Sequence, residues 1–470
     1  MNRYGRCRGA GLVRVALVSV LIAAACGPAP APTPAVATPD PAAALMAAGA
    51  YSAAEEAYRE AMLAAPESPE PALALADLYL AWSRPEWGLT VLAEATERGA
   101  QPDEVDRRQL ALLSAVGRWE EARVLAEALL AANPASLDGL ASLPEIHLQQ
   151  HDCAGAVAAA GQHLDAYQAA ASPPPAATLP DSVAESLRIW AVLSRGGDEE
   201  QLDALARQHL DPELAAALQL QTPERDLVVG LRLIRAGRWA LAACVLTRAV
   251  EAEQAKPMSP DHAGQAHTWL GEALSRVGRT SEGERHLRLA IELDPESALA
   301  WLLLGQHYMS RDALERARPA LLNAQRLDPM NPIPCLAVAD LKAAMGRYDE
   351  VNTWVNAARV RAPGDPGIAK AAARFYLSRW LGNGSEAMDA AQTAVRLDPH
   401  DAEAHMLVGW ALLNEERFAA AHEALAEAIA LDPALAEAYH WQAVAFDRTG
   451  AGAEATAARV RAADLGYPDP

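Results

Sequence analysis

The chain is long, acidic and poor in aromatic residues. It has 470 residues, and its 40 Lys and Arg against 61 Asp and Glu give a net charge of −21. This charge opposes binding to phosphate backbones, so no nucleic-acid partner is expected. Aromatic residues make up 5% of the chain, and runs of Val, Ile and Thr with period-two alternation are hard to find. The composition therefore disfavours strands and predicts an all-α protein.

Residues 1–26 have the pattern of a secretory signal. Four early arginines precede the apolar run VALVSVLIAAA, which is long enough for a signal h-region and too short to span a membrane. The run ends at Cys26, and LIAAACG resembles the lipobox of bacterial lipoproteins, where the signal is cut before a cysteine that receives lipid. The resemblance implies a lipoprotein signal peptide over 1–26 and lipidation of Cys26. One departure is Ala23, where the lipobox usually has a large aliphatic residue.

A lipid on Cys26 would decide where the protein resides. Each buried methylene contributes roughly 0.8 kcal/mol, so several acyl chains would hold the protein on a membrane for long periods. Gly27 follows the cysteine, and in enterobacterial lipoproteins a residue other than Asp there goes with outer-membrane sorting. The expected location is the bacterial cell envelope, on the outer membrane and facing the periplasm. An ordinary secreted protein and an uncleaved anchor are the alternatives.

Residues 27–41 form a Pro- and Ala-rich linker that contains the sequence PAPAPTPAVATPDP. This composition cannot bury a core and favours extended polyproline II geometry, at about 3.1 Å per residue. We expect the linker to act as a stalk that holds the folded body away from the lipid surface.

The strongest pattern in the chain is a repeated tail motif, which reads ELDP at 292–295, RLDP at 326–329 and 396–399, and ALDP at 430–433. The prolines at 295, 329, 363, 399 and 433 are spaced 34 residues apart, with one interval of 36. That period and those residues resemble the tetratricopeptide repeat. The resemblance implies an α-solenoid, a superhelical stack of antiparallel helix pairs.

The internal residues of the repeats agree with this resemblance. A small residue in the first helix lets two helices cross closely, an aromatic residue fills the groove beyond it, and Pro ends the second helix. The stretch 402–433 carries these marks at Gly409, Leu412, Phe418, Ala421, Leu425, Ala428 and Pro433. The stretch 298–329 carries them at Trp301, Leu304, Gly305, Tyr308, Ala317, Leu321, Ala324 and Pro329. With weaker copies upstream, about ten or eleven repeats are expected.

One interruption divides the array. The stretch SPPPAATLP at 172–180 cannot continue a helix, and the repeat signature fades until about residue 223. We predict an N-terminal array over 42–168 and a C-terminal array over 223–468, joined by a Pro-rich break and degenerate helical segment over 169–222. The alternative is a surface insertion in one continuous superhelix.

In the tetratricopeptide family the first helix of each repeat lines the binding groove. Projecting these positions onto the C-terminal array gives a candidate partner-binding groove at Trp269, Glu272, Gln306, Tyr376, Trp380, Met406, Trp410, His440 and Trp441. Large apolar side chains of this kind anchor peptide ligands. The alternative is that they pack on the next repeat. The Lys, Arg and Asn clamp by which some members bind a peptide carboxylate is not expected, because the faces are interpreted as carrying Leu, Trp, Ala and Gln.

The sequence contains little that points to chemistry. His147, His151, Cys153 and His163 are close in sequence, but the repeat register separates the first two, so no metal site and no cofactor are expected. GxSxG, Walker and HExxH motifs are missing, so no enzyme is expected. Cys153, Cys244 and Cys335 remain after the signal and Cys26, and their wide spacing implies no disulfide framework. Buried, unreactive thiols are predicted.

These observations predict a non-catalytic scaffold for protein–protein interactions, a membrane-anchored tetratricopeptide lipoprotein whose partners are other proteins or peptides. The alternative is a regulatory or guiding subunit of an envelope complex for polysaccharide synthesis or export, or for secretion. No amphipathic helix follows the last repeat, at about 436–468, so self-association at the C-terminal end is also possible.

Overall fold

The computed structural model describes residues 41–134, 136–170, 180–194, 209–220, 222, 224–252, 258–379 and 384–468. These residues form 24 helices and no strand, so the all-α prediction is confirmed. Two compact units are present. Of the described residues, those up to Ile146 and those within Ala160–Ser186 form one unit, and those within His147–Ala159 and from Leu187 onward form the other. The predicted signal peptide and nearly all of the predicted linker lie outside the described residues. The sub-array boundaries at 168 and 223 stay a prediction.

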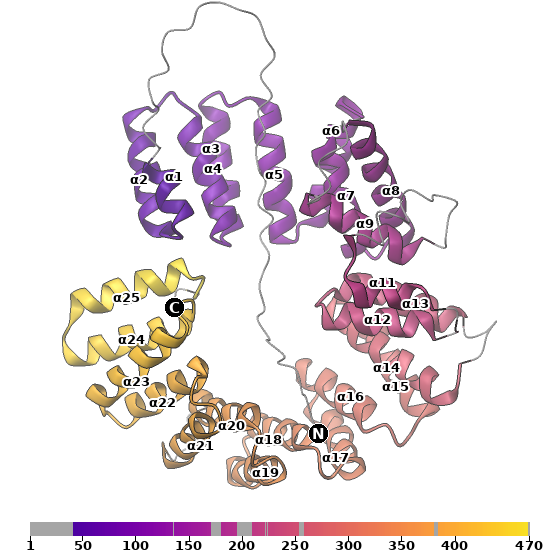
Figure 1. Ribbon diagram of the computed structural model, residues 1–470, viewed down its shortest axis with the longest axis vertical. Coiled ribbons are helices and arrows are strands. Elements are labelled where there is room, and N and C mark those ends of the chain that lie inside the picture. Colours follow the sequence, from indigo (N-terminus) through magenta and orange to yellow (C-terminus); the bar gives the residue numbers. More distant parts are fainter. Residues whose placement is uncertain are drawn as a thin grey trace, which may run out of the picture. The chain divides into compact units, whose positions relative to one another are not determined.

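The first unit is built of short helices that follow one another as pairs (Figure 1). Helices α7, α8 and α9 each have one part in this unit and one part in the second. The bounds are α1(Pro41–Ala47), α2(Tyr51–Ala64), α3(Glu70–Ala81), α4(Pro85–Glu97), α5(Pro102–Val116), α6(Trp119–Ala132), α7(Leu137–Gln149), α8(Cys153–Ala170) and α9(Asp181–Leu193).

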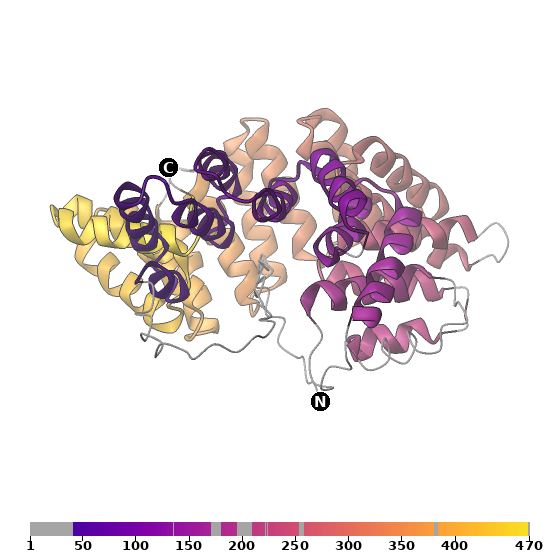
Figure 2. The ribbon, with the colours of Figure 1, turned by 90° about the horizontal axis from the view of Figure 1, so that it is seen from above.

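The second unit continues the paired arrangement to the C-terminal end. Figure 2 shows the last pairs, drawn in orange and yellow, as bundles of helices of similar length. The bounds are α11(Pro212–Leu218), α12(Arg225–Arg235), α13(Trp239–Ala252), α14(Pro260–Arg276), α15(Thr280–Leu293), α16(Ala298–Ser310), α17(Leu314–Leu327), α18(Pro332–Ala344), α19(Tyr348–Arg361), α20(Pro366–Arg379), α21(Gly384–Leu397), α22(Ala402–Asn414), α23(Phe418–Leu431), α24(Ala436–Thr449) and α25(Gly452–Asp464).

A left-handed residue makes the turn inside each of several pairs. Gly278, between α14 and α15, has a φ of 87°, a conformation that glycine adopts without steric cost. The equivalent turns before α17 and α23 use Asp312 and Glu416, with φ of 56° and 59°. The tight turn is therefore imposed by the repeat and does not depend on glycine alone.

The two helices of a pair cross where the sequence places its small residue. A Cβ atom added to Gly409 of α22 would lie 2.5 Å from Leu425 Cγ of α23, closer than side-chain atoms pack. Leu425 and its neighbours Ala421 and Ala428 are 0% exposed. Glycine at 409 therefore lets the backbone of α22 lie directly on the leucine of the second helix, as the repeat pattern predicts.

The tail motif separates one pair from the next. The second helices α17 and α23 end at Leu327 and Leu431, and the following aspartates leave the helical conformation. The next first helix then begins with a polar cap. The Asp401 carboxylate accepts a hydrogen bond from the Ala404 N–H at 3.1 Å, at the start of α22. Such a cap satisfies one of the free N–H groups of the first turn.

In the second unit, the second helix of a pair packs on the first helix of the next pair, as α21 does on α22 and α23 on α24, and the first helices of successive pairs also contact each other. Contacts run from α12 to α14, α14 to α16, α16 to α18, α20 to α22 and α22 to α24. Side chains on these helices are thus brought together from different repeats, and this layer holds the candidate groove. Among the described helices, none is long and apolar enough to cross a membrane.

Candidate functional site

Charged side chains from three consecutive first helices meet in the C-terminal repeats. Lys370 and Arg374 lie one turn apart on α20. The Lys370 Nζ atom is 2.7 Å from Asp401 Oδ2 and 2.7 Å from Glu403 Oε2, at the start of α22. Although burial lowers the pKa of Lys370, its hydrogen bonds to these two carboxylates outweigh burial and raise it. The ammonium group is therefore held charged between two carboxylates.

Arg374 extends this network to a third helix. Its guanidinium group donates to Glu403 Oε1 at 2.9 Å and to both Glu437 carboxylate oxygens at 3.0 Å. Burial by itself raises the pKa of Glu403, but the hydrogen bonds from Lys370 and Arg374 outweigh it and lower the pKa. The five charged groups, counted with Asp401, carry three negative and two positive charges, which leaves one excess negative charge.

Two tryptophans continue the surface. The Trp441 Nε1–H donates to Glu437 Oε1 at 3.3 Å, and the Trp441 ring stacks on Trp410 of α22, with ring centroids 4.2 Å apart. Trp410 is 9% exposed, while Trp441 is half-buried. We call Lys370, Arg374, Asp401, Glu403, Trp410, Glu437 and Trp441 the α20–α24 surface. It joins an ion-pair network to an aromatic stack across three repeats.

His440 lies beside this surface. Its ring stacks on Tyr467, with centroids 4.4 Å apart, and meets Trp441 edge-on at 5.0 Å. Burial lowers the pKa of His440, so its neutral form is favoured. Tyr467, which follows α25, therefore packs against α24, the first helix of the last pair.

The structure divides the predicted groove residues by exposure. Tyr376 and Met406 are 3% and 0% exposed and, like Trp410, belong to the core of the C-terminal array, as in the packing alternative. Trp269, Glu272, His440 and Trp441 are half-buried, and Gln306 is exposed. Trp380 and the predicted lipidation site Cys26 lie outside the described residues. The groove residues with accessible atoms therefore come from α14, α16 and α24.

The groove prediction left out two basic residues of the first helix α20. Lys370 and Arg374 are both paired with carboxylates of the following repeats. A pairing of this kind depends on which repeats come into contact, so the sequence pattern of one repeat could not show it. The same holds for Glu403 and Glu437, which the groove prediction left out. The expected lack of a clamp for a peptide carboxylate stays a prediction.

The prediction of three unpaired thiols is wrong. Cys153 and Cys244 form a disulfide with Cα atoms 5.9 Å apart, across a sequence separation of 91 residues. Only Cys335 is a free thiol among the described residues. It is buried, and burial raises its pKa. No spacing rule links cysteines so far apart, since their proximity arises only when the chain folds.

The histidines near Cys153 each have their own surroundings. His147 Nδ1 is 3.0 Å from Asp152 Oδ2, and His163 Nδ1 is 2.8 Å from Ser186 Oγ. The pKa of His151 is lowered, mainly by burial and then by the charge of Arg279. Among the described residues, no group of three or more His, Cys, Asp or Glu side chains is arranged to hold a metal ion.

Comparison with known proteins identifies two segments of the second unit. The family described as tetratricopeptide repeat matches residues 270–332 and 364–434. These segments are tetratricopeptide repeats. The match includes all of α22 and α23 and the first-helix residues Lys370, Arg374, Glu403 and Trp410 of the α20–α24 surface.

Curated relatives share only a short part of this repeat array. Tetratricopeptide repeat protein 37 of Xenopus laevis is 31% identical over 84 residues, and Superkiller complex protein 3 of Mus musculus is 30% identical over 84 residues. Each match covers 17% of this chain and 5% of the relative. The chain thus spans about one twentieth of the length of these relatives. Among solved structures, yeast Tom70 is similar with 16% identity, 91% coverage of both chains and a TM-score of 0.43.

Tetratricopeptide repeats generally serve as non-catalytic scaffolds that bind other proteins or peptides. Their stacked pairs present an extended surface, on which the identity of the side chains decides the ligand. In this chain the α20–α24 surface is the part of that layer where charged and aromatic side chains from three repeats converge.

Proposed function

We propose that the chain is a non-catalytic interaction scaffold of the bacterial cell envelope, anchored to a membrane by lipid on Cys26. It binds a partner protein or peptide along the first helices of its C-terminal repeats. The observation that carries the proposal is the α20–α24 surface, where a half-buried tryptophan borders a network of five charged groups. Tryptophan in such a setting anchors partners, because it buries a large area at little entropic cost.

The charge of the surface indicates the kind of segment that it would take. Three carboxylates face two basic groups, and the whole chain carries a net charge of −21. A partner segment with basic and apolar residues would therefore be attracted over a distance and find Trp441 as an apolar contact. We accordingly expect association to slow as ionic strength rises.

The disulfide supports the proposed location. Disulfides persist in oxidising compartments such as the bacterial periplasm and are rare in the cytosol. The Cys153–Cys244 bond therefore agrees with the signal-like residues 1–26.

The anchor is tested by the substitution Cys26→Ser in cells that produce the full chain. We expect the wild-type protein in the membrane fraction and the variant in the soluble fraction. Cys335→Ser is the matched control, because it removes a buried thiol outside the signal. Membrane association of the Cys26→Ser variant would overturn the lipid anchor and leave the repeat surface as a separate question.

Partner binding is tested by capturing the full-length protein in mild detergent and identifying co-purifying proteins by mass spectrometry. Trp441→Ala should lose partners that the wild type retains. Trp87→Ala is the control, since Trp87 is a tryptophan of the first unit with an exposed fraction of 46%. Identical partners for both variants would place binding elsewhere. A transferase or an export protein among the lost partners would favour a guiding subunit of an envelope complex.

A further inference from the structure

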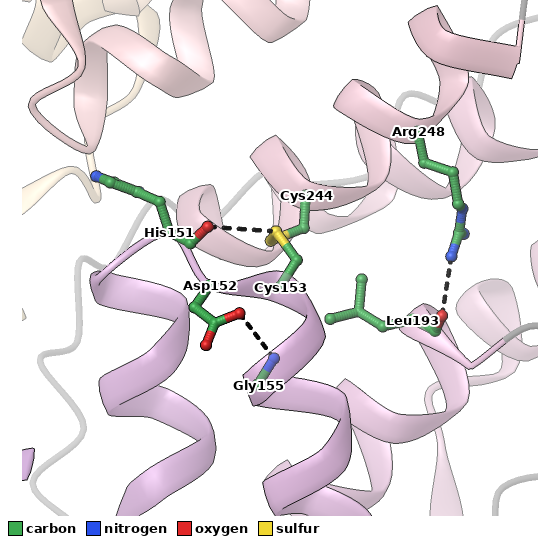
Figure 3. The surroundings of a disulfide bond; sticks show 7 residues. All are labelled: His151, Asp152, Cys153, Gly155, Leu193, Cys244 and Arg248. Carbon is green, nitrogen blue, oxygen red and sulfur yellow. Dashed lines mark hydrogen bonds between the residues drawn. A yellow bond between two sulfur atoms is a disulfide. The ribbon is translucent and has the colours of Figure 1, made fainter.

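The disulfide joins two sulfurs in unequal surroundings (Figure 3). Cys153 is the first residue of α8, whereas Cys244 lies in the middle of α13. Cys153 is partly exposed, while Cys244 has an exposed fraction of 7%. A reagent from solution can therefore reach the sulfur of Cys153 more readily than that of Cys244.

The two cysteines also differ in their place on their helices. Cys153 begins α8, so it lies beside the free N–H groups of the first helical turn, where a helix stabilises negative charge. The neighbouring Asp152 carboxylate is held by other groups, because it accepts a hydrogen bond from the Gly155 N–H at 2.8 Å and lies 3.0 Å from His147 Nδ1. Cys244 is enclosed among buried apolar residues of α13.

A second attachment lies one turn further along α13. Arg248 donates to the carbonyl oxygen of Leu193 at 3.1 Å (Figure 3). It also donates to the carbonyl oxygen of Val192 at 3.1 Å, and so caps the C-terminal end of α9. Its guanidinium group also pairs with Asp226 of α12 at 2.7 and 2.8 Å. Helix α13 thus holds the start of α8 by a covalent bond and the end of α9 by hydrogen bonds.

We propose that Cys153 and Cys244 form a thiol–disulfide exchange site, in which Cys153 is the sulfur that reacts with an external partner and Cys244 completes the bond. The partner is a dithiol–disulfide oxidoreductase. In the oxidised state the site holds residues 147–159 on α13, and in the reduced state the polar contacts of Arg248 remain as the attachment of α9.

The exchange proceeds in two balanced steps. The Cys153 thiolate attacks one sulfur of the partner's disulfide, and the partner's second sulfur leaves as a thiolate. The Cys244 thiol then loses its proton and attacks Cys153 Sγ, which forms the Cys153–Cys244 bond and releases the partner's first sulfur. The two cysteines lose two electrons, and the partner's disulfide becomes a dithiol. Reduction follows the reverse path, with attack on the Sγ of the partly exposed Cys153 and departure of Cys244.

The order of reaction is tested on the reduced full chain with glutathione disulfide as the probe. After an acid quench, mass spectrometry identifies the cysteine that carries glutathione. We expect the Cys244→Ser variant to accumulate glutathione on Cys153. In the Cys153→Ser variant, Cys244 should react at a rate at least roughly tenfold lower than that of Cys153 in the Cys244→Ser variant. Equal rates, or faster reaction at Cys244, would overturn the proposal.

Cys335 provides an internal control for folding in the same experiment. It is buried and unpaired, so it should remain unmodified as long as the chain is folded. If a variant exposes Cys335, the reduced wild type decides instead, because a brief pulse of iodoacetamide should alkylate Cys153 before Cys244. Alkylation of both at one rate would count against the proposal.

The structural consequence is tested by hydrogen exchange on the wild-type chain, oxidised and reduced. We expect the amides of residues 153–159 to exchange faster after reduction, while those of α22 and α23 stay unchanged. Unchanged exchange at 153–159 would show that the bond does not hold this segment and would overturn that part of the proposal.

Discussion

Trp410 and Trp441 lie face to face on α22 and α24, with ring centroids 4.2 Å and ring planes 21° apart. They come from equivalent helices of successive repeats, yet their exposure differs, since Trp410 is buried and Trp441 is half-buried. One ring therefore belongs to the core between repeats, and the other presents part of its area to solvent. We therefore expect Trp410 to stabilise the fold and Trp441 to be available to a partner.

Substitution of each tryptophan should show this separation. Trp410→Ala leaves a cavity in the core, so we expect the free energy of unfolding to fall by about 3–5 kcal/mol. Trp441→Ala removes a partly exposed ring and should cost about 1–2 kcal/mol with unchanged helix content. Urea denaturation followed by circular dichroism measures both losses. Equal losses would mean that Trp441 is a core residue and weaken its assignment to a binding surface.

The ion pairs of Arg374 should be modest in energy and sensitive to acid. The Arg374 and Glu403 side chains are 39% and 35% exposed, so screening by water limits the expected loss for Arg374→Met to about 1 kcal/mol or less. The folded-state pKa of Glu403 is lowered. Its stabilisation is therefore present above the pKa of an unfolded glutamate and is lost as the pH falls through the lowered value.

The measurement compares wild type and Arg374→Met by urea denaturation at pH 7 and in acid. The difference in unfolding free energy should shrink in acid, as the carboxylates become protonated. Arg459→Met is the matched control, because its ion pair with Asp447 is more exposed, with both side chains above 40%. A difference that is constant with pH would show that Arg374 acts through packing of its aliphatic part alone.

The repeat pattern predicted the pairs because its information is local. The spacing of the LDP motifs, the crossing glycine at 409 and the small residues at 421 and 428 each act within one helix pair, and the structure places all of them as expected. Such positions recur every 34 residues or so, which makes them visible in a single sequence.

The sequence could not show the contacts between residues that lie far apart in the chain. The Cys153–Cys244 bond joins residues on either side of an interruption that carries no repeat signature. Likewise, Arg374 reaches Glu437, 63 residues away, because α20 and α24 each pack on α22. Both contacts join residues of different helices far apart in the chain, and the sequence of one repeat does not specify such contacts.

The crossing of α22 and α23 leads to a prediction on Gly409. The Cβ of Gly409→Ala would meet Leu425 Cγ at 2.5 Å, so the helices must separate, and we expect a loss of about 1–3 kcal/mol in unfolding free energy. Gly452→Ala is the control, since nothing lies within 4 Å of the added Cβ at the start of α25. That variant should be neutral or slightly stabilising, because alanine favours helix. Thermal or urea denaturation of both variants measures the contrast, and equal behaviour would contradict the close crossing.

A buried histidine pair should make the second unit sensitive to acid. His267 of α14 and His286 of α15 have Nδ1 atoms 2.9 Å apart and stacked rings, and each is 7% exposed. Arg285 donates to His286 Nε2 at 3.1 Å, so the His286 Nδ1–H must donate to His267 Nδ1, and both rings are neutral in this arrangement. Burial, together with the partner ring and the charges of Arg285 and Arg279, lowers the pKa of His286 to about 4, although Glu282 opposes the shift. Burial and Arg285 also lower the pKa of His267.

The sign of the effect follows from the protons bound in each state. An unfolded histidine titrates near pH 6.5, while the folded pair takes up protons only at lower pH. The unfolded chain therefore binds more protons between these values, and the free energy of unfolding falls as the pH drops from about 6.5 toward 4. His286→Gln supplies a side-chain amide for hydrogen bonding in place of the imidazole and cannot take up a proton. The stability of this variant should therefore depend less on pH over this range. Urea denaturation at pH 7.5, 6 and 5 tests this, with the exposed His400→Gln as control. A pH dependence in His286→Gln as steep as in the wild type would show that other groups govern the acid sensitivity.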